Sequence, residues 1–166
     1  MANALYRDAS ALAKRYVPER GSALVDAILD TVPANQIYVL NIGAGEVVSI
    51  LVRKRNAGII SVLAFGQAVA IFDAEIVRAP DISKVSVTSR LVTSSFPLIV
   101  AHAINSTDAI ALKSALAIAR RLRAAGDDLI LVASDLRLLR AAQAEGLKTF
   151  NPDSQDHTAL VALLGP

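Results

Sequence analysis

The 166-residue sequence contains no cysteine and no tryptophan, and aromatic residues make up only 4% of it. Without cysteine the protein can form neither disulfides nor thiolate metal sites, and thiol catalysis is excluded. The scarcity of aromatic rings argues against a broad base-stacking platform for nucleic acid. The formal net charge of +2 is too small to indicate a partner by itself. Any metal site must therefore be built from ligands other than cysteine.

Long apolar runs are also missing. The longest, at 57–72, contains Gln67 and falls short of the roughly 20 residues that a membrane span needs. The first ten residues, MANALYRDAS, carry charges too early for a signal peptide. Hydrophobic residues make up 54% of the sequence and charged residues 19%, which favours a buried, alanine-rich α/β fold. We expect a single domain over 1–166, in a soluble cytoplasmic protein.

The stretch 105–152 carries the clearest pattern. Apolar residues at helical spacing predict a helix over 107–125, capped by Ser106 or Thr107. The unbroken apolar run 129–133 predicts a buried parallel strand, and Asp135 opens a further helix that stops near Gly146. A short strand at 147–150 follows. Strand, helix and strand with short links indicate a right-handed crossover, in which ligands gather at the carboxyl ends of the strands.

The rest of the chain repeats this alternation. The other expected strands cover 4–7, 37–40 and 85–87, and the other expected helices cover 9–17, 22–29, 46–55, 59–72, 89–103 and 157–164. Two features stand out: the glycine-rich segment 41–45 is expected to be a flexible turn, and Pro97 should disturb its helix. The pattern predicts an α/β fold of three layers, with a parallel central sheet of four to five strands flanked by helices.

Four carboxylates share one placement. Asp8, Glu46, Asp108 and Asp135 each lie at a turn into a predicted helix, and three of them follow a predicted strand. Each one alone is explained as a helix cap, because helix amino ends favour negative charge. Four at one edge of one sheet would repel one another unless a cation neutralised them. Oxygen ligands favour Mg²⁺ or Mn²⁺, and such an ion suits hydrolysis of a phosphodiester.

The motifs around these acids resemble PIN-domain ribonucleases of the VapC type, the toxins of bacterial toxin–antitoxin pairs. Four segments carry the resemblance: Tyr6–Tyr16 with Pro18-Glu19 and Gly21-Ser22, Glu46–Ser49 with Leu51–Lys54 and Gly58, Asp108–Leu112 with Ala115-Leu116, and Ala133–Asp135 with Leu138-Leu139, Ala141-Ala142, Glu145–Leu147 and Asn151-Pro152. No single motif is specific, but their order and spacing cover nearly the whole chain.

The resemblance implies a divalent-metal site built from Asp8, Glu46, Asp108 and Asp135. It also implies endonucleolytic cleavage of RNA, a homodimer, and an antitoxin that blocks the site. Ser10 matches a hydroxyl residue often close to the metal, where it would orient a metal-bound water.

Some residues depart from the family pattern or allow other interpretations. Arg7 replaces the usual apolar residue before the first acid, and Lys113 stands where a small residue is common. Arg137, after Asp135, is open to two interpretations, a contact to substrate phosphate or a surface residue. The segment 39–46, VLNIGAGE, resembles a nucleotide-binding loop but lacks its third glycine. A second hypothesis is a PIN-like module that binds RNA or protein without cutting.

Overall fold

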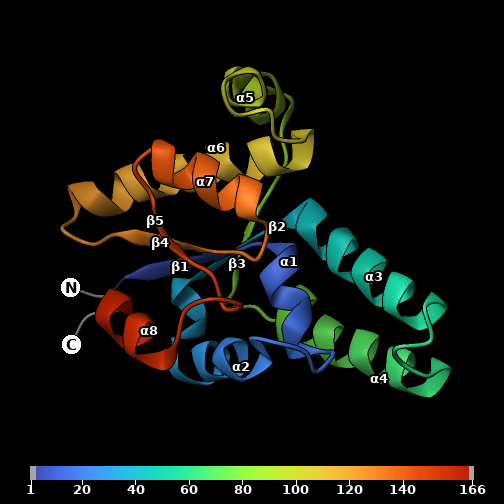
Figure 1. Cartoon of the computed structure of the whole chain (residues 1–166). Helices are drawn as coiled ribbons and strands as arrows, with labels where there is room; N and C mark the ends of the chain where they lie inside the picture. Colours follow the sequence, from blue (N-terminus) through green and yellow to red (C-terminus); the bar gives the residue numbers. More distant parts are fainter. Residues whose placement is uncertain (1–2, 165–166) are drawn as a thin grey trace.

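The computed structural model describes residues 3–164 of the chain. Within them, five parallel strands form one sheet in the order β3-β2-β1-β4-β5 (Figure 1). The strands are β1 (Ala4–Arg7), β2 (Ile37–Leu40), β3 (Ser83–Val85), β4 (Leu129–Val132) and β5 (Lys148–Phe150). The central strand β1 pairs with both β2 and β4, so that Leu5 lies between Ile37 and Ile130. The expected parallel sheet of four to five strands is confirmed.

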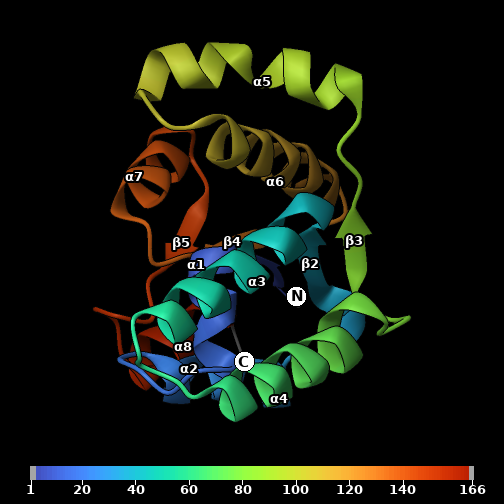
Figure 2. The ribbon, with the colours of Figure 1, turned by 90° about the vertical axis from the view of Figure 1, so that its right-hand side faces the viewer.

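Helices cover both faces of this sheet. They are α1 (Ala9–Leu12), α2 (Ser22–Thr31), α3 (Asn41–Asn56), α4 (Val62–Phe72), α5 (Ser89–His102), α6 (Ser106–Ala124), α7 (Leu136–Ala144) and α8 (His157–Leu164). Helices α6 and α7 pack on one face, and α5 crosses α6 on its outer side (Figures 1 and 2). Helices α1 to α4 and α8 contribute to the core under the other face. The three expected layers are therefore present.

Side chains of the strands alternate between two hydrophobic cores. Tyr6 and Leu131 point into the core beneath α6 and α7, whereas Leu5 and Ile130 point into the core beneath α1, α2 and α4. Both faces of the middle strands are buried, which explains why these strands read as continuous apolar runs. None of the helices within 3–164 is long and apolar enough to cross a membrane.

The glycine-rich segment is where the sequence-based prediction was wrong. It does not form a flexible turn, because α3 begins at Asn41 directly after β2 and includes Gly43 and Gly45. Glycine costs a helix about 1 kcal/mol relative to alanine, a cost that burial of Val47 and Leu51, both 0% exposed, offsets. Glu46 consequently lies in the second turn of α3, and the loop that a nucleotide-binding motif requires does not form.

Other boundaries also differ from the prediction. The helix expected over 9–17 is shorter, with α1 followed by the 3₁₀ turn η1 (Ala13–Arg15). Helix α6 is capped by Asn105, whose side chain accepts a hydrogen bond from the Asp108 N–H, and not by Ser106 or Thr107. Helix α5 continues through Pro97.

Arg7 lies in the central strand and is 2% exposed. All three of its guanidinium nitrogens are buried without a hydrogen-bond partner. Burial lowers the pKa of Arg7 to about 10, although nearby Tyr16 acts in the opposite direction. The neighbouring acids Asp26 and Glu75 instead form ion pairs with Arg15. A charge that is desolvated but poorly compensated costs stability.

We therefore predict that Arg7→Met leaves the free energy of unfolding unchanged or raises it by about 1–3 kcal/mol, because methionine fills the space without a buried charge. Arg15→Met is the matched control, and it should destabilise the protein because it leaves three acids without their cation. Urea unfolding of both variants measures the effect. A loss above about 1 kcal/mol in Arg7→Met would contradict the assignment of Arg7 as an uncompensated charge.

Candidate active site

The order of the strands reverses direction between β1 and β4, and two of the four predicted acids, Asp8 and Asp135, lie at that point. The chain proceeds from β1 to β2 and β3 on one side, and then to β4 and β5 on the other. Asp8 follows β1, and Asp135 caps α7 just after β4. The Asp8 N–H donates to the Val132 carbonyl at 3.0 Å, which fixes the two strand ends together. The carboxyl edge at such a reversal is where ligands bind in open α/β sheets.

A cavity of about 370 Å³ opens at this edge. Its walls include all four predicted acids: Asp8, Glu46, Asp108 and Asp135. The acids come from four separate elements: the end of β1, α3, α6 and the start of α7. Asp108 reaches the cavity from the first turn of α6, which follows a helix and not a strand. Ser10, Ser49 and Arg53 also line the cavity.

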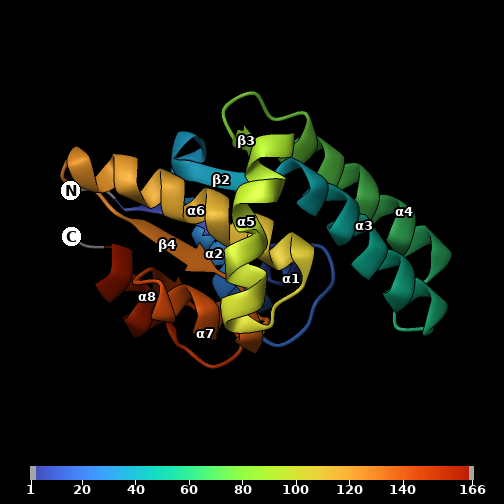
Figure 3. The same ribbon diagram turned by 90° about the horizontal axis from the view of Figure 1, so that it is seen from above.

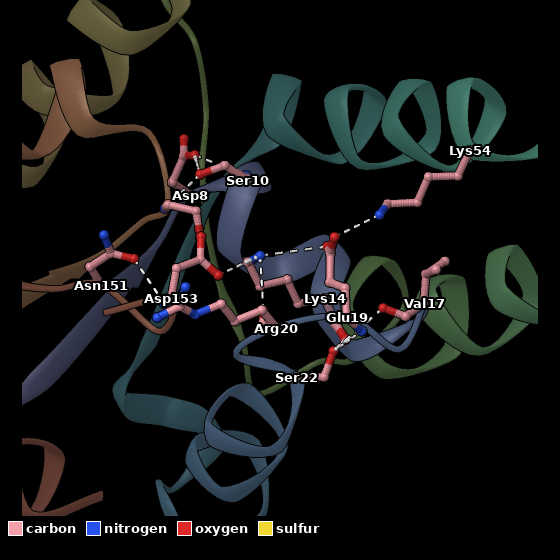
Figure 4. Close-up of polar contacts among 11 residues, drawn as sticks. Asp8, Ser10, Lys14, Val17, Glu19, Arg20, Ser22, Lys54, Asn151 and Asp153 are labelled. Atoms are coloured by element: carbon pink, nitrogen blue, oxygen red, sulfur yellow. Dashed lines mark hydrogen bonds and ion pairs between the residues drawn. The ribbon is translucent and has the colours of Figure 1, made fainter. Parts of the chain in front are cut away.

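Asp8 is held by Ser10. Asp8 Oδ2 accepts hydrogen bonds from the Ser10 N–H at 2.9 Å and from its hydroxyl at 2.5 Å (Figure 4). The Ser10 hydroxyl oxygen in turn accepts from the Ser134 N–H at 2.9 Å. Ser10 thus links the β1 and β4 ends and orients Asp8.

Capping explains two of the four acids but not the other two. Asp8 caps α1, and Asp135 Oδ1 accepts from the N–H groups of Arg137 and Leu138 at the start of α7. Asp108 and Glu46 lie inside their helices and cap neither of them. Helix capping alone therefore does not account for the placement of all four side chains around one cavity.

Asn105 supports Asp108 in two ways. Its Nδ2 donates to Asp108 Oδ2 at 2.8 Å, and its Oδ1 accepts from the Asp108 N–H at 2.8 Å. The sequence signal for this pair was the three-residue spacing between a cap residue and an acid, which is that of a capping box. The prediction missed it because Ser106 and Thr107 are equally good cap residues in isolation.

Burial and the negative charges of neighbouring acids raise the pKa values of three of the four acids. Burial, together with the charges of Asp8, Asp135 and Glu46, raises the pKa of Asp108 to about 7. Burial and the charge of Asp135 also raise the pKa of Asp8, against the hydrogen bonds from Ser10. Burial and the charge of Asp8 raise the pKa of Glu46. Like charges in one cavity disfavour their common ionisation unless a cation joins them.

The donor set suits a hard divalent cation, since it consists of carboxylate oxygens. The hydrogen bonds from Asn105 to Asp108 and from the α7 backbone to Asp135 each fall on one carboxyl oxygen, so the second oxygen can serve as a ligand. Within residues 3–164, however, no three acidic or histidine side chains are close enough to hold an ion together as they stand. The chemistry of the residues fits the ion, and coordination would draw repelling side chains inward.

A chain of ion pairs connects α3, whose residues line the cavity, to the segment after β5. Lys14, 7% exposed, lies 2.8 Å from Asp153 and 3.6 Å from Glu19 (Figure 4). Glu19 also pairs with Lys54 of α3 at 2.7 Å. These contacts tie η1, the segment after β5 and α3 together, so they fix the helix that carries Glu46. The sequence analysis included Lys14 and Lys54 only as members of motif segments, because the pairs of Lys14 with Asp153 and of Lys54 with Glu19 join segments distant in the chain.

The cationic residues near the cavity differ in placement. Arg53 lines the cavity one turn beyond Ser49, although the sequence analysis assigned it no role. The side chain of Arg137 is 60% exposed and lies 3.9 Å from Asp135 Oδ2. This exposure agrees with the interpretation of Arg137 as a surface residue.

Comparison with known proteins establishes the fold. No family model and no curated protein sequence matches the chain. PAE2754 from Pyrobaculum aerophilum matches with a TM-score of 0.62 and 18% identity over 98% of this chain and 96% of that chain. VapC20 from Mycobacterium tuberculosis, a toxin that cleaves the sarcin-ricin loop, matches with a TM-score of 0.58 and 19% identity over 87% and 96%. FitAB, solved with a DNA fragment, matches with a TM-score of 0.61 and 15% identity over 92% of this chain and 98% of that chain.

These likenesses confirm the fold that the sequence motifs implied. The chain has the PIN-like α/β fold of VapC-type proteins, with a five-stranded parallel sheet within residues 3–164 and helices on both faces (Figure 1). Seen from above, α5 crosses over α6 (Figure 3).

We predict that Asp108→Asn stabilises the protein at high pH in the presence of a chelator. The folded state raises the pKa of Asp108 from 3.8 to about 7. Protonated Asp108 therefore contributes its full stabilisation below about pH 3.8, and this stabilisation is lost as the pH rises through about 7. Asparagine cannot ionise and keeps the bond from Asn105. The variant should exceed the wild type by about 2 kcal/mol near pH 8.5 and match it near pH 4.

Thermal unfolding across this pH range measures the difference. The exposed Asp81 offers the matched control, and Asp81→Asn should follow the wild-type curve at every pH. Equal stability of Asp108→Asn and the wild type near pH 8.5 would show that the four charges do not strain the site.

Proposed function

We propose that this protein is a divalent-metal-dependent endoribonuclease that acts as the toxin of a toxin–antitoxin pair in the cytoplasm. The observation that carries the proposal is the gathering of Asp8, Glu46, Asp108 and Asp135 around one cavity at the carboxyl edge of the sheet. No histidine or cysteine lies among the residues that line this cavity. Carboxylates without such partners suit the binding of a hard cation better than direct acid–base or nucleophilic chemistry on their own.

In this proposal the four acids hold Mg²⁺ or Mn²⁺. Such an ion supplies a nucleophilic water at neutral pH and offsets the charge that builds on a phosphate during hydrolysis. Binding the ion also removes the repulsion that raises the pKa of Asp108. The free energy that the site loses by gathering four carboxylates is thus recovered when the ion binds.

The other residues of the site orient the acids and the substrate. Ser10 fixes Asp8 through two hydrogen bonds, and Asn105 fixes Asp108 through its side-chain amide. Arg53 provides a cation in the wall of the cavity, where it would contact a phosphate of the RNA. Such prearrangement matters because positioning supplies much of the rate enhancement in phosphoryl chemistry.

The solved structures support the choice of substrate and partner. VapC20 is a toxin that cleaves the sarcin-ricin loop, and it shares this fold. The four acids of this chain occupy the sequence motifs through which it resembles VapC-type ribonucleases. We extend RNA cleavage and an antitoxin partner to this chain on that basis.

Apolar surface is available for protein partners. A groove of about 490 Å³ runs between α3 and α4, lined by residues such as Ala44, Val48 and Val69. Helix α3 separates this groove from the acidic cavity, since its Ser49 and Arg53 line that cavity. Val62 and Leu63, 76% and 72% exposed, extend the apolar surface at the start of α4. Exposed apolar patches of this kind mark protein interfaces, and we assign them to the antitoxin and to a second copy of the chain in a homodimer.

A second function is favoured by one observation. Within residues 3–164 the acids do not converge closely enough to hold an ion as they stand. A PIN-like module that binds RNA or protein without cutting would not need its acids to lie close enough to hold an ion. The two functions differ in whether metal ions support cleavage.

We predict that the purified protein cleaves a single-stranded RNA pool in Mn²⁺ or Mg²⁺ and stops when a chelator is added. Asp8→Asn should lower the cleavage rate by at least about 100-fold, because it removes a ligand while retaining the acceptor for Ser10. Asp81→Asn is the control and should cleave at the wild-type rate. Cleavage that persists in Asp8→Asn would contradict the metal-site assignment, whereas RNA binding by the wild type without cleavage in either metal would establish the second function.

A further inference from the structure

A second cavity lies along α7, the helix that Asp135 caps. It has a volume of about 410 Å³ and lies between α7 and the segment that follows β5. Its wall includes Leu136 at the amino end of α7, and the residue before it, Asp135, lines the acidic cavity. None of the residues that line it is acidic, whereas four carboxylates line the acidic cavity. An anionic ligand would therefore contact no carboxylate in the wall of this second cavity.

Three side-chain amides in this cavity are oriented by bonds at one end. Gln143 Nε2 donates to Thr149 Oγ1 at 2.8 Å, which leaves its Oε1 as an acceptor. Gln155 Oε1 accepts from the Asn151 N–H at 2.7 Å, which leaves its Nε2 as a donor. Asn151 Oδ1 accepts from the Asp153 N–H at 2.9 Å, which leaves its Nδ2 as a donor. The cavity thus offers one fixed acceptor and two fixed donors.

Two further residues complete the cavity. Arg140 uses its Nε to donate to the Leu136 carbonyl at 3.2 Å, so its terminal nitrogens can bind an anion such as phosphate. Leu136 is 62% exposed and provides an apolar surface at the rim, on which the flat face of a base can pack. Amide groups, an apolar surface and a cation together match the parts of a nucleotide.

We propose that this cavity binds a pyrimidine nucleotide of the RNA, next to the phosphodiester that is cleaved in the acidic cavity. The inference deepens the proposed function and rests on it for its biological role. The Watson–Crick edges of cytosine and uracil order their groups differently, but each presents two acceptors and one donor, which match in number the two donors and one acceptor of the amides. Guanine presents the opposite set, with two donors and one acceptor, and leaves the amide groups mismatched.

The test is a titration of the ¹⁵N-labelled full chain with cytidine, uridine, adenosine and guanosine 5′-monophosphate, followed by NMR without metal ions. We expect the pyrimidine nucleotides to bind at least about fivefold more tightly than guanosine 5′-monophosphate and to shift the side-chain amide signals of Gln143 and Gln155. Arg140→Ala should weaken all four nucleotides by about tenfold, because it removes the phosphate contact. Gln143→Ala should reduce the pyrimidine preference to within about twofold.

Matched controls are exposed residues of the same type on other helices. Arg120→Ala on α6 and Gln67→Ala on α4 should leave all four affinities unchanged. Equal binding of the four nucleotides, a preference for guanosine, or full affinity in Arg140→Ala would overturn the proposal. The titration needs no metal and no cleavage. Its failure with intact ribonuclease activity rejects the pyrimidine site alone, and its success without activity leaves an RNA-binding module.

Discussion

Repulsion among four carboxylates is the constraint on which this structure depends. The fold brings Asp8, Glu46, Asp108 and Asp135 to one cavity, and their mutual charges add to burial in raising the pKa of Asp108 to about 7. A protein gains nothing in stability from such an arrangement, because each ionised acid makes the next one harder to ionise. The arrangement is explained if a divalent cation binds among the acids, which relieves the strain and recruits the ion for chemistry.

The scaffold supplies rigidity where the charges repel. The reversal of strand order between β1 and β4 places Asp8 and Asp135 on adjacent strand ends, and Ser10 joins those ends by hydrogen bonds to Asp8 and from Ser134. The ion pairs from Asp153 through Lys14 and Glu19 to Lys54 attach α3 to the same framework. These restraints keep the acids near one another although their charges oppose it.

The sheet and the strand-end acids Asp8 and Asp135 were predictable because each depends on local pattern, whereas Asp108 follows a helix and was identified through the family motif. Buried parallel strands read as apolar runs, and an acid after a strand reads as a site at the carboxyl edge. The start of α3 was not predictable in this way, because two glycines suggest a turn, and only the burial of Val47 and Leu51 shows that the helix prevails. The ion pairs of Lys14 with Asp153 and of Lys54 with Glu19 were equally hidden, since they join segments distant in the chain. The burial of Arg7 in the central strand also breaks the local rule that such strands are apolar.

The measurement that tests the central claim most directly is isothermal titration of Mn²⁺ into the purified wild-type protein beside Asp108→Asn. The account predicts a binding isotherm in the wild type that is lost in the variant, with protons released near pH 7 because the ion displaces the proton that the raised pKa of Asp108 retains. Binding of equal strength in both proteins would contradict a site built from these four acids. Absence of binding in both would contradict the claim that their repulsion is relieved by a resident cation.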